Sequence, residues 1–314
     1  MLGYVVRRLL LTLPTLLLVA AAVFVLMRLI PGDPVQLMLG DRADDAQIAE
    51  QRARMGLDQP LPLQFGHWLA AVARGDLGQS ITDQQPVLPL IAERFAVSAS
   101  IVLAAVALAT LLAVPAGLVA AWQQNRPLDL CIVFGATLLL SVPSFWLGLL
   151  LLLYFGMQLG WVPVVGYVPM AQDFWAGAAY LVLPIVTLVM IETGVLTRMA
   201  RASAIEVQRL EYVTHARAKG LPEWQVLLRH VLPNAFAPTL TLIGLVLGNL
   251  LGGIAVLETV FTLPGLGRLL VDAIFARDYP VVQGVLLFTA GLYVLINLVV
   301  DLLYPLFDPR VAAA

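Results

Sequence analysis

The sequence predicts an all-α membrane protein with six transmembrane helices, and two observations lead to this prediction. Of the 314 residues, 61% are hydrophobic and only 12% are charged, whereas a soluble domain has roughly 25% charged residues. Six apolar runs are also long enough to cross a hydrocarbon core of ~30 Å as helices. They cover residues 9–30, 97–122, 129–156, 178–198, 236–257 and 281–303.

The first apolar run follows a basic N-terminus, "MLGYVVRRLLL". A signal peptide has an apolar region of only about 7–15 residues, and this run continues to Ile30. We therefore expect residues 1–30 to form a retained first transmembrane helix, ended by Pro31-Gly32-Asp33-Pro34, where helix continuation is disfavoured.

Residues 31–96 are mixed in composition and too long for a simple connection, so they predict an extramembrane region. Residues 62–73, "PLQFGHWLAAVA", suit a short helix. It either lies on the membrane surface as an amphipathic helix or packs within a small extramembrane cap, and the sequence leaves both open.

Arginine and lysine placement predicts the orientation. With six spans both termini share a side, and that side carries most of the basic residues near span ends: Arg7, Arg8, Arg126, Arg310 and those between Arg198 and Arg229. The opposite short loops carry Arg268 and Arg277. The positive-inside rule then places both termini in the cytoplasm and, in a bacterium, residues 31–96 in the periplasm.

Within the third span, Ser141 and Ser144 flank Pro143, a pattern that predicts a helix kink. In the fifth span Gly244, Gly248 and Gly252 recur every four residues on one helix face. This predicts close approach of another helix, with local flexibility of a pore helix as the alternative.

Polar residues inside spans are read as functional by default. Glu192 and Asn249 are therefore candidates for a translocation path, although Glu192 could instead pair structurally with Arg198 or simply lie near the cytoplasmic interface. Asn297 and Asp301 lie in the sixth span, and Asp301, near its end, reads as a cap or interface group.

Residues 199–233 are unusually charged for this chain and predict two short helices joined by an elbow. Ser203 or a neighbour suits the N-cap of the first helix, and Gly220 suits its left-handed exit. Pro222 suits the first turn of the second helix, and Pro233 its end. An apolar stripe of the second helix comprises Trp224, Leu227, Leu228 and Val231. The alternative, a solvated basic loop, needs neither elbow nor stripe.

The spacing within "THARAKGLPEWQVLLRHVLPN" resembles the cytoplasmic loop signature of binding-protein-dependent ABC importer permeases. That signature is Glu-Ala-Ala, three residues, Gly, nine residues, then Ile-x-Leu-Pro. Ala216, Gly220, Leu232 and Pro233 match it, whereas Thr214, His215 and His230 depart from it.

"ARAKGL" resembles the dipeptide/oligopeptide/nickel class of these permeases, as do "RRLLLTLPTLL" with "PGDP", "GLDQPLP", "RGDLGQS", "ETVFTLPGLGRLLVDAI", "RDYPVVQG" and "DLLYPLFDPR". The resemblance therefore covers essentially the whole chain. It implies a permease core over residues 97–314, with loop 199–233 acting as a coupling helix on a cytoplasmic ATPase. It also suggests a partly re-entrant segment over 258–280.

The coupling contact implied by this resemblance comprises Glu211, Thr214, His215, Ala216, Arg217, Ala218, Lys219, Gly220, Leu221 and Pro222. Expected partners are a second homologous permease, two ATPase subunits, a periplasmic substrate-binding protein and membrane lipid, but no nucleic acid. Because the chain has no G-x-x-x-x-G-K-[ST] loop, ATP and Mg²⁺ belong to the ATPases, and no cofactor is expected here. The cargo, whether peptide, glutathione, nickel chelate or opine, stays open.

Two other classes of function fit the sequence less well than an importer subunit. An ion-coupled secondary transporter would be expected to show several intramembrane acids or inverted repeats, whereas the sequence shows one clear mid-span acid, Glu192, and no repeat. A membrane enzyme is disfavoured because His67, His215 and His230 are scattered and Cys131 is a lone cysteine in an apolar run. The sequence therefore predicts no catalytic and no metal-binding residues.

Overall fold

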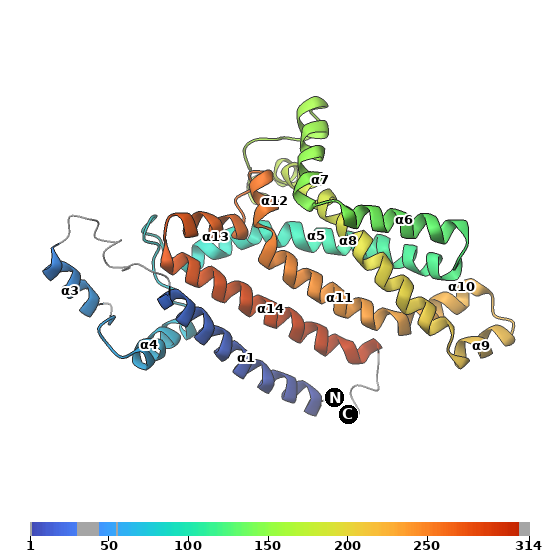
Figure 1. The fold of residues 1–314 in the computed structure, drawn as a ribbon, viewed down its shortest axis with the longest axis horizontal. Helices are drawn as coiled ribbons and strands as arrows, with labels where there is room; N and C mark the ends of the chain where they lie inside the picture. Colours follow the sequence, from blue (N-terminus) through green and yellow to red (C-terminus); the bar gives the residue numbers. More distant parts are fainter. Residues whose placement is uncertain (1, 30–43, 55, 308–314) are drawn as a thin grey trace.

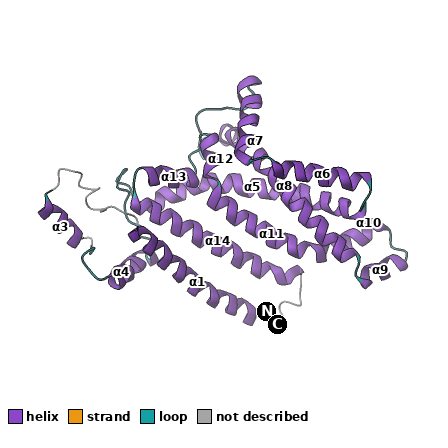
Figure 2. Ribbon diagram, in the orientation of Figure 1, coloured by secondary structure: helices purple, strands orange, loops and turns teal. Residues whose placement is uncertain are grey.

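The structure, a computed structural model, describes residues 2–29, 44–54 and 56–307. Within these ranges the regular structure is helical, apart from an isolated bridge between Gln79 and Pro86 (Figure 2). The PGDP segment predicted to end the first span lies outside the described residues.

Five helices are long and apolar enough to cross a membrane and run along the length of the molecule (Figure 1). They are α1 (Leu2–Leu29), α5 (Val87–Trp122), α8 (Phe174–Gln208), α11 (Leu232–Gly253) and α14 (Tyr279–Phe307). Helix α5 begins at Val87 rather than at residue 97, and α8 continues to Gln208 rather than ending at 198. These helices are longer than predicted because hydropathy identifies only the apolar part of a helix, whereas its backbone hydrogen bonds continue through polar turns.

The third predicted span, over residues 129–156, is broken. Helix α6 (Pro127–Ser141) is followed by α7 (Ser144–Leu151) and a π-helical segment η1 (Leu152–Gln158), and the two parts are bent by 93°. The predicted kink at Pro143 is present, because Pro143 is the extended N-cap of α7. The bend is larger than the word kink implies, since α7 stands away from the bundle (Figure 1).

Helices α5 and α8 form the most extensive pair of the core. A Cβ atom at Gly117 of α5 would meet the backbone of Thr197 and Arg201 and the side chain of Ala200. The absence of that atom lets the two helices lie in backbone contact. Further along α5, Ala109 and Ala113 pack with Leu196 of α8, all three fully buried.

Helices α11 and α14 approach closely at two glycines of the predicted face. A Cβ atom at Gly244 would meet Val300, and one at Gly248 would meet the ring of Tyr293. Gly252 differs, because a Cβ atom there would meet open space. The predicted glycine face therefore forms a helix contact within the chain at Gly244 and Gly248, but not at Gly252.

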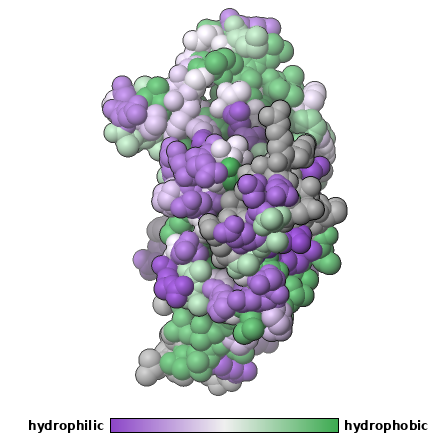
Figure 3. Space-filling view, turned by 90° about the vertical axis from the view of Figure 1, so that its left-hand side faces the viewer, coloured by the Kyte–Doolittle hydropathy of each residue, from purple (hydrophilic) through white to green (hydrophobic). Residues whose placement is uncertain are grey.

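The 31–96 region contains α3 (Asp45–Arg54) and α4 (Leu61–Ala73). Helix α4 contacts α1 through the rings of Phe65 and Trp68 around Phe24, yet none of its residues is buried. Helices α3, α4 and α13 (Leu266–Phe275) lie towards one end of the molecule, and α12 (Ala255–Val260) lies nearer the middle, beside α7 (Figure 1). Seen from that end, hydrophilic side chains gather in the middle of the face (Figure 3).

Candidate functional site

The charged stretch folds into an elbow at the end opposite to α13 (Figure 1). Helix α8 continues to Gln208, and α9 (Glu211–Ala218) starts after Leu210. The predicted N-cap at Ser203 was therefore wrong: Ser203 is buried within α8. Its neighbour Ala204 belongs to the buried cluster beneath the elbow, so packing keeps this turn helical.

Gly220 is the turning point of the elbow. Its φ is +80°, and a Cβ atom there would meet nothing within 4 Å. Glycine is therefore needed for the left-handed backbone rather than for space. Pro222 follows as the N-cap of α10 (Glu223–Val226), one position before the predicted first turn.

Polar contacts hold the two arms of the elbow together. The Arg217 guanidinium donates to the Glu223 carboxylate at 2.9 and 3.3 Å and to the Gln208 side chain at 3.3 Å. These bonds link α8, α9 and α10, so the elbow is fixed in shape rather than a loose basic loop.

The inner face of the elbow is apolar and the outer face is polar. Val213 and Ala216 of α9 are buried in a cluster with Val226, Leu227 and Val231. The exposed members of the predicted coupling set are Glu211, Thr214, His215, Ala218, Lys219, Gly220 and Pro222. We call these seven residues the elbow surface. Ala216, expected at the contact centre, faces inward, while Arg217 and Leu221 are half-buried.

The second arm does not end at Pro233, contrary to the prediction. Helix α10 passes through the π-helical turn η2 (Leu227–Val231) directly into α11. Pro233 lies in the first turn of α11, where a missing N–H is tolerated. The predicted stripe is also divided, because Leu227 and Val231 are buried whereas Trp224 and Leu228 are exposed.

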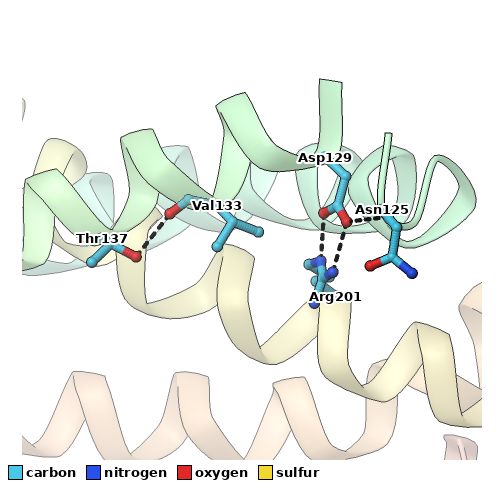
Figure 4. A network of polar contacts seen from close by, with 5 residues as sticks. All are labelled: Asn125, Asp129, Val133, Thr137 and Arg201. Carbon is cyan, nitrogen blue, oxygen red and sulfur yellow. Dashed lines mark hydrogen bonds and ion pairs between the residues drawn. The ribbon is translucent and has the colours of Figure 1, made fainter. Parts of the chain in front are cut away.

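A buried ion pair lies above the elbow between α6 and α8 (Figure 4). Arg201 Nε and Nη2 donate to the two oxygens of Asp129 at 2.6 and 2.7 Å, and the backbone N–H of Asn125 donates to Asp129 at 2.9 Å. Asp129 is 1% exposed. The pair joins the start of α6 to the part of α8 that leads into the elbow.

Glu192 lies midway along α8 and is 8% exposed. In the described part of the chain it makes no ion pair with Arg198, the structural alternative. The buried hydroxyls of Thr110 and Thr193 have no hydrogen-bond partner among the described residues. The α5–α8 contacts of Gly117 with Ala200 and of Ala113 with Leu196 put Thr110 and Thr193 at about the same height. Each of these two neighbouring helices therefore carries one unsatisfied hydroxyl at a similar height.

The other polar span residues lie elsewhere. Asn249 is exposed on α11, on a different helix from Glu192. Asp301 forms an ion pair with Arg8 at 2.7 Å, which ties the first turns of α1 to the last turns of α14. The structure thus does not bring Glu192 and Asn249 into one contact.

A second buried carboxylate was missed from the sequence. Glu258 of α12 is fully buried and accepts from Ser98 Oγ at 2.5 Å and from the backbone N–H of Arg268 at 2.9 Å. Ser98 Oγ in turn accepts from the backbone N–H of Leu266 at 2.8 Å. Burial is the largest influence on the pKa of Glu258 and raises it, while these hydrogen bonds lower it. The sequence feature that could have indicated this site is the position of Glu258, directly after an apolar run and shortly before Pro264-Gly265.

Comparison with known proteins decides the family. The family described as "Binding-protein-dependent transport system inner membrane component" matches residues 113–313, and its N-terminal companion matches residues 1–102. The chain belongs to this permease family. A "Probable peptide ABC transporter permease protein" of Sinorhizobium fredii is 40% identical to this permease over 98% of each chain. The "Glutathione transport system permease protein GsiC" of Salmonella choleraesuis is 43% identical over 99% of each chain.

Membership fixes the class of function. This permease is a multi-pass inner-membrane subunit of an ABC importer and is not itself an enzyme. It works with ATPase and substrate-binding components, as the family's description implies. The alternative of an ion-coupled secondary transporter is thereby overturned.

Proposed function

We propose that this permease forms one half of the translocation path of an ATP-driven importer for peptides or related small solutes. The other half is a second, homologous permease, and two cytoplasmic ATPase subunits supply ATP and Mg²⁺. A periplasmic binding protein delivers the cargo, and both termini lie in the cytoplasm. The peptide and glutathione systems named for the two relatives support this class of cargo.

The elbow carries the proposal. It is fixed by the Arg217–Glu223 pair, packed on its inner side and polar on its outer side. A projection of this kind transmits a push from a docked partner into α8, which is joined to α9 by two residues, and into α11, which is continuous with α10 through η2. We assign the elbow surface to contact with an ATPase, and Gly220 to the shape of that surface.

The second permease is assigned to the side of the bundle from which α7 and η1 project. Trp146, Tyr154 and Met157 expose 50%, 52% and 67% of their surface there. Large aromatic side chains are favoured at interfaces between proteins. These side chains lie beside the right-angled bend after α6, so a partner helix can pack against them there.

Cysteine crosslinking tests the elbow assignment. Cys131, the native cysteine, is exposed and is first replaced by serine. In the assembled importer, Ala218→Cys is then expected to crosslink to an ATPase subunit, and the matched exposed control Arg74→Cys, near the far end, is not. Crosslinking from both positions, or from Arg74→Cys alone, would contradict the assignment.

Isolation of the complex tests the composition. Affinity purification in mild detergent is expected to bring an ATPase and a distinct second permease in comparable amounts. A stable preparation that contains this chain only would contradict the proposed assembly.

A further inference from the structure

A cavity of about 280 Å³ lies at the end of the molecule opposite to the elbow. It is formed between α5 and the turn that leads into α13. Its lining comprises Arg94, Pro264, Gly265, Arg268, Leu269 and Asp272. We call it the arginine cavity, since two of its lining residues are arginines from different helices.

Arg94 brings an unpaired cation to this cavity. Its Nε is buried and has no hydrogen-bond partner among the described residues. The neighbouring acid Glu93 is exposed, and adjacent residues of a helix do not face the same way. Arg94 as a whole is half-buried, so the cost lies in its unsatisfied Nε–H, and an anion that accepts from this group would remove that cost.

The other charged groups around the cavity are already engaged. Arg268 faces Asp272 at 3.7 Å along α13. The first backbone N–H groups of α13 donate to Ser98 and Glu258, so the Glu258 carboxylate and the helix N-terminus satisfy one another. The positive charge that is left for a ligand is that of Arg94.

We propose that the arginine cavity binds a carboxylate, and that this carboxylate is the free terminal group of the cargo during its passage. A guanidinium group binds a carboxylate through two parallel hydrogen bonds. The cavity is smaller than the roughly 300–1,000 Å³ of sites that enclose a whole drug-sized ligand, so it takes one end of a peptide. The inference rests on the proposed cargo class and assigns a site within it.

The first test uses two probes that differ only in the carboxylate, N-acetyl-trialanine and its C-terminal amide. Thermal unfolding of the purified protein is measured in detergent without binding protein. The acid is expected to raise the midpoint more than the amide does for the wild type and for the control Arg74→Gln, whose arginine is exposed and outside the cavity. Arg94→Gln is expected to abolish the difference, and Arg94→Lys to keep part of it. Equal effects of acid and amide on the wild type would overturn the proposal.

The second test identifies the source of the carboxylate. In vesicles containing the full importer, Arg94→Gln is expected to lower peptide uptake per ATP hydrolysed severalfold. The binding-protein concentration that half-maximally stimulates ATP hydrolysis should stay unchanged. A raised half-maximal concentration with normal uptake per ATP would overturn the proposal, because the carboxylate would then belong to the binding protein. Absence of ATP-driven uptake by the wild type would refute the importer proposal. The thermal unfolding comparison of acid and amide would still test carboxylate binding in the cavity.

Discussion

Asp129 and Arg201, which are 72 positions apart in sequence, form a two-point ion pair that joins α6 to α8. The carboxylate is 1% exposed, and the arginine side chain is 24% exposed. The two partners are therefore desolvated to different degrees. That difference makes the consequences of removing each one unequal.

Arg201→Gln is expected to destabilise the protein more than Asp129→Asn. The first change leaves a buried carboxylate without its cation, a loss of about 3–5 kcal/mol for a fully buried pair. The second leaves an arginine that still reaches solvent, and its cost should fall nearer about 1–3 kcal/mol. Thermal unfolding of the single and double variants in detergent measures both. Equal losses, or a double variant as unstable as the sum of the singles, would contradict a direct pair.

Gly220→Val is expected to abolish most uptake while the protein still folds. Valine is strained at a φ of +80°, whereas asparagine tolerates the left-handed region. Gly220→Asn should therefore retain much of the uptake, although both side chains would enter open space. Uptake and ATP hydrolysis are measured together. If Asn and Val variants fail alike, side-chain bulk rather than backbone shape explains the requirement.

Glu192→Gln is expected to lower uptake of cargo bearing a free amino group more than uptake of its N-acetylated form. The carboxylate is buried in the middle of α8 without an ion pair to Arg198, which suits a transient cationic partner. Glu206→Gln, an exposed acid of the same helix, is the control. Unchanged uptake of every cargo tested would remove Glu192 from the proposed path.

Gly248→Ala is expected to destabilise the α11–α14 contact, whereas Gly252→Ala should be nearly silent. A Cβ atom at Gly248 would meet the Tyr293 ring, and one at Gly252 would meet nothing within 4 Å. The cost at Gly248 should be about 1–3 kcal/mol, as for overpacked cores. Comparison of the two thermal midpoints decides this, and equal midpoints would count against the contact.

Acid should stabilise the wild type through Glu258. Burial raises its folded pKa above the ordinary value of 4.5, so the folded state binds the proton more tightly than the unfolded state. This contribution is fully present below pH 4.5 and is lost as the pH rises through the folded pKa. The thermal midpoint of Glu258→Gln should therefore depend less on pH over that window. If the thermal midpoint of Glu258→Gln depends on pH as that of the wild type does, another titrating group is responsible for the stabilisation by acid.

The membrane class and the approximate spans could be predicted from sequence because apolar length alone carries that information. The turn at Gly220 was also predictable, since few residues other than glycine suit its backbone. The right-angled bend after α6 could not be predicted. Hydropathy does not report the direction in which a helix runs, and Pro143 indicates that a helix breaks but not by what angle.

Errors in the elbow arose where packing outweighs local preference. Ser203 has the chemistry of an N-cap, yet its place beside buried Ala204 keeps it inside α8. Pro233 has the chemistry of a stop, yet it falls in a first turn and α11 runs on. Partners distant in sequence, Asp129 with Arg201 and Ser98 with Glu258, leave no periodic signal that a single chain can reveal.

The bend after α6 has a consequence for how the chain enters the bilayer. Helix α6 is 15 residues long, so it rises ~22 Å, less than the ~30 Å of the hydrocarbon core. A helix of this length is too short to reach the far leaflet, and the chain turns by 93° after it. We therefore expect a neighbouring subunit, rather than lipid alone, to hold α7 in place, which would couple insertion of this part of the chain to assembly.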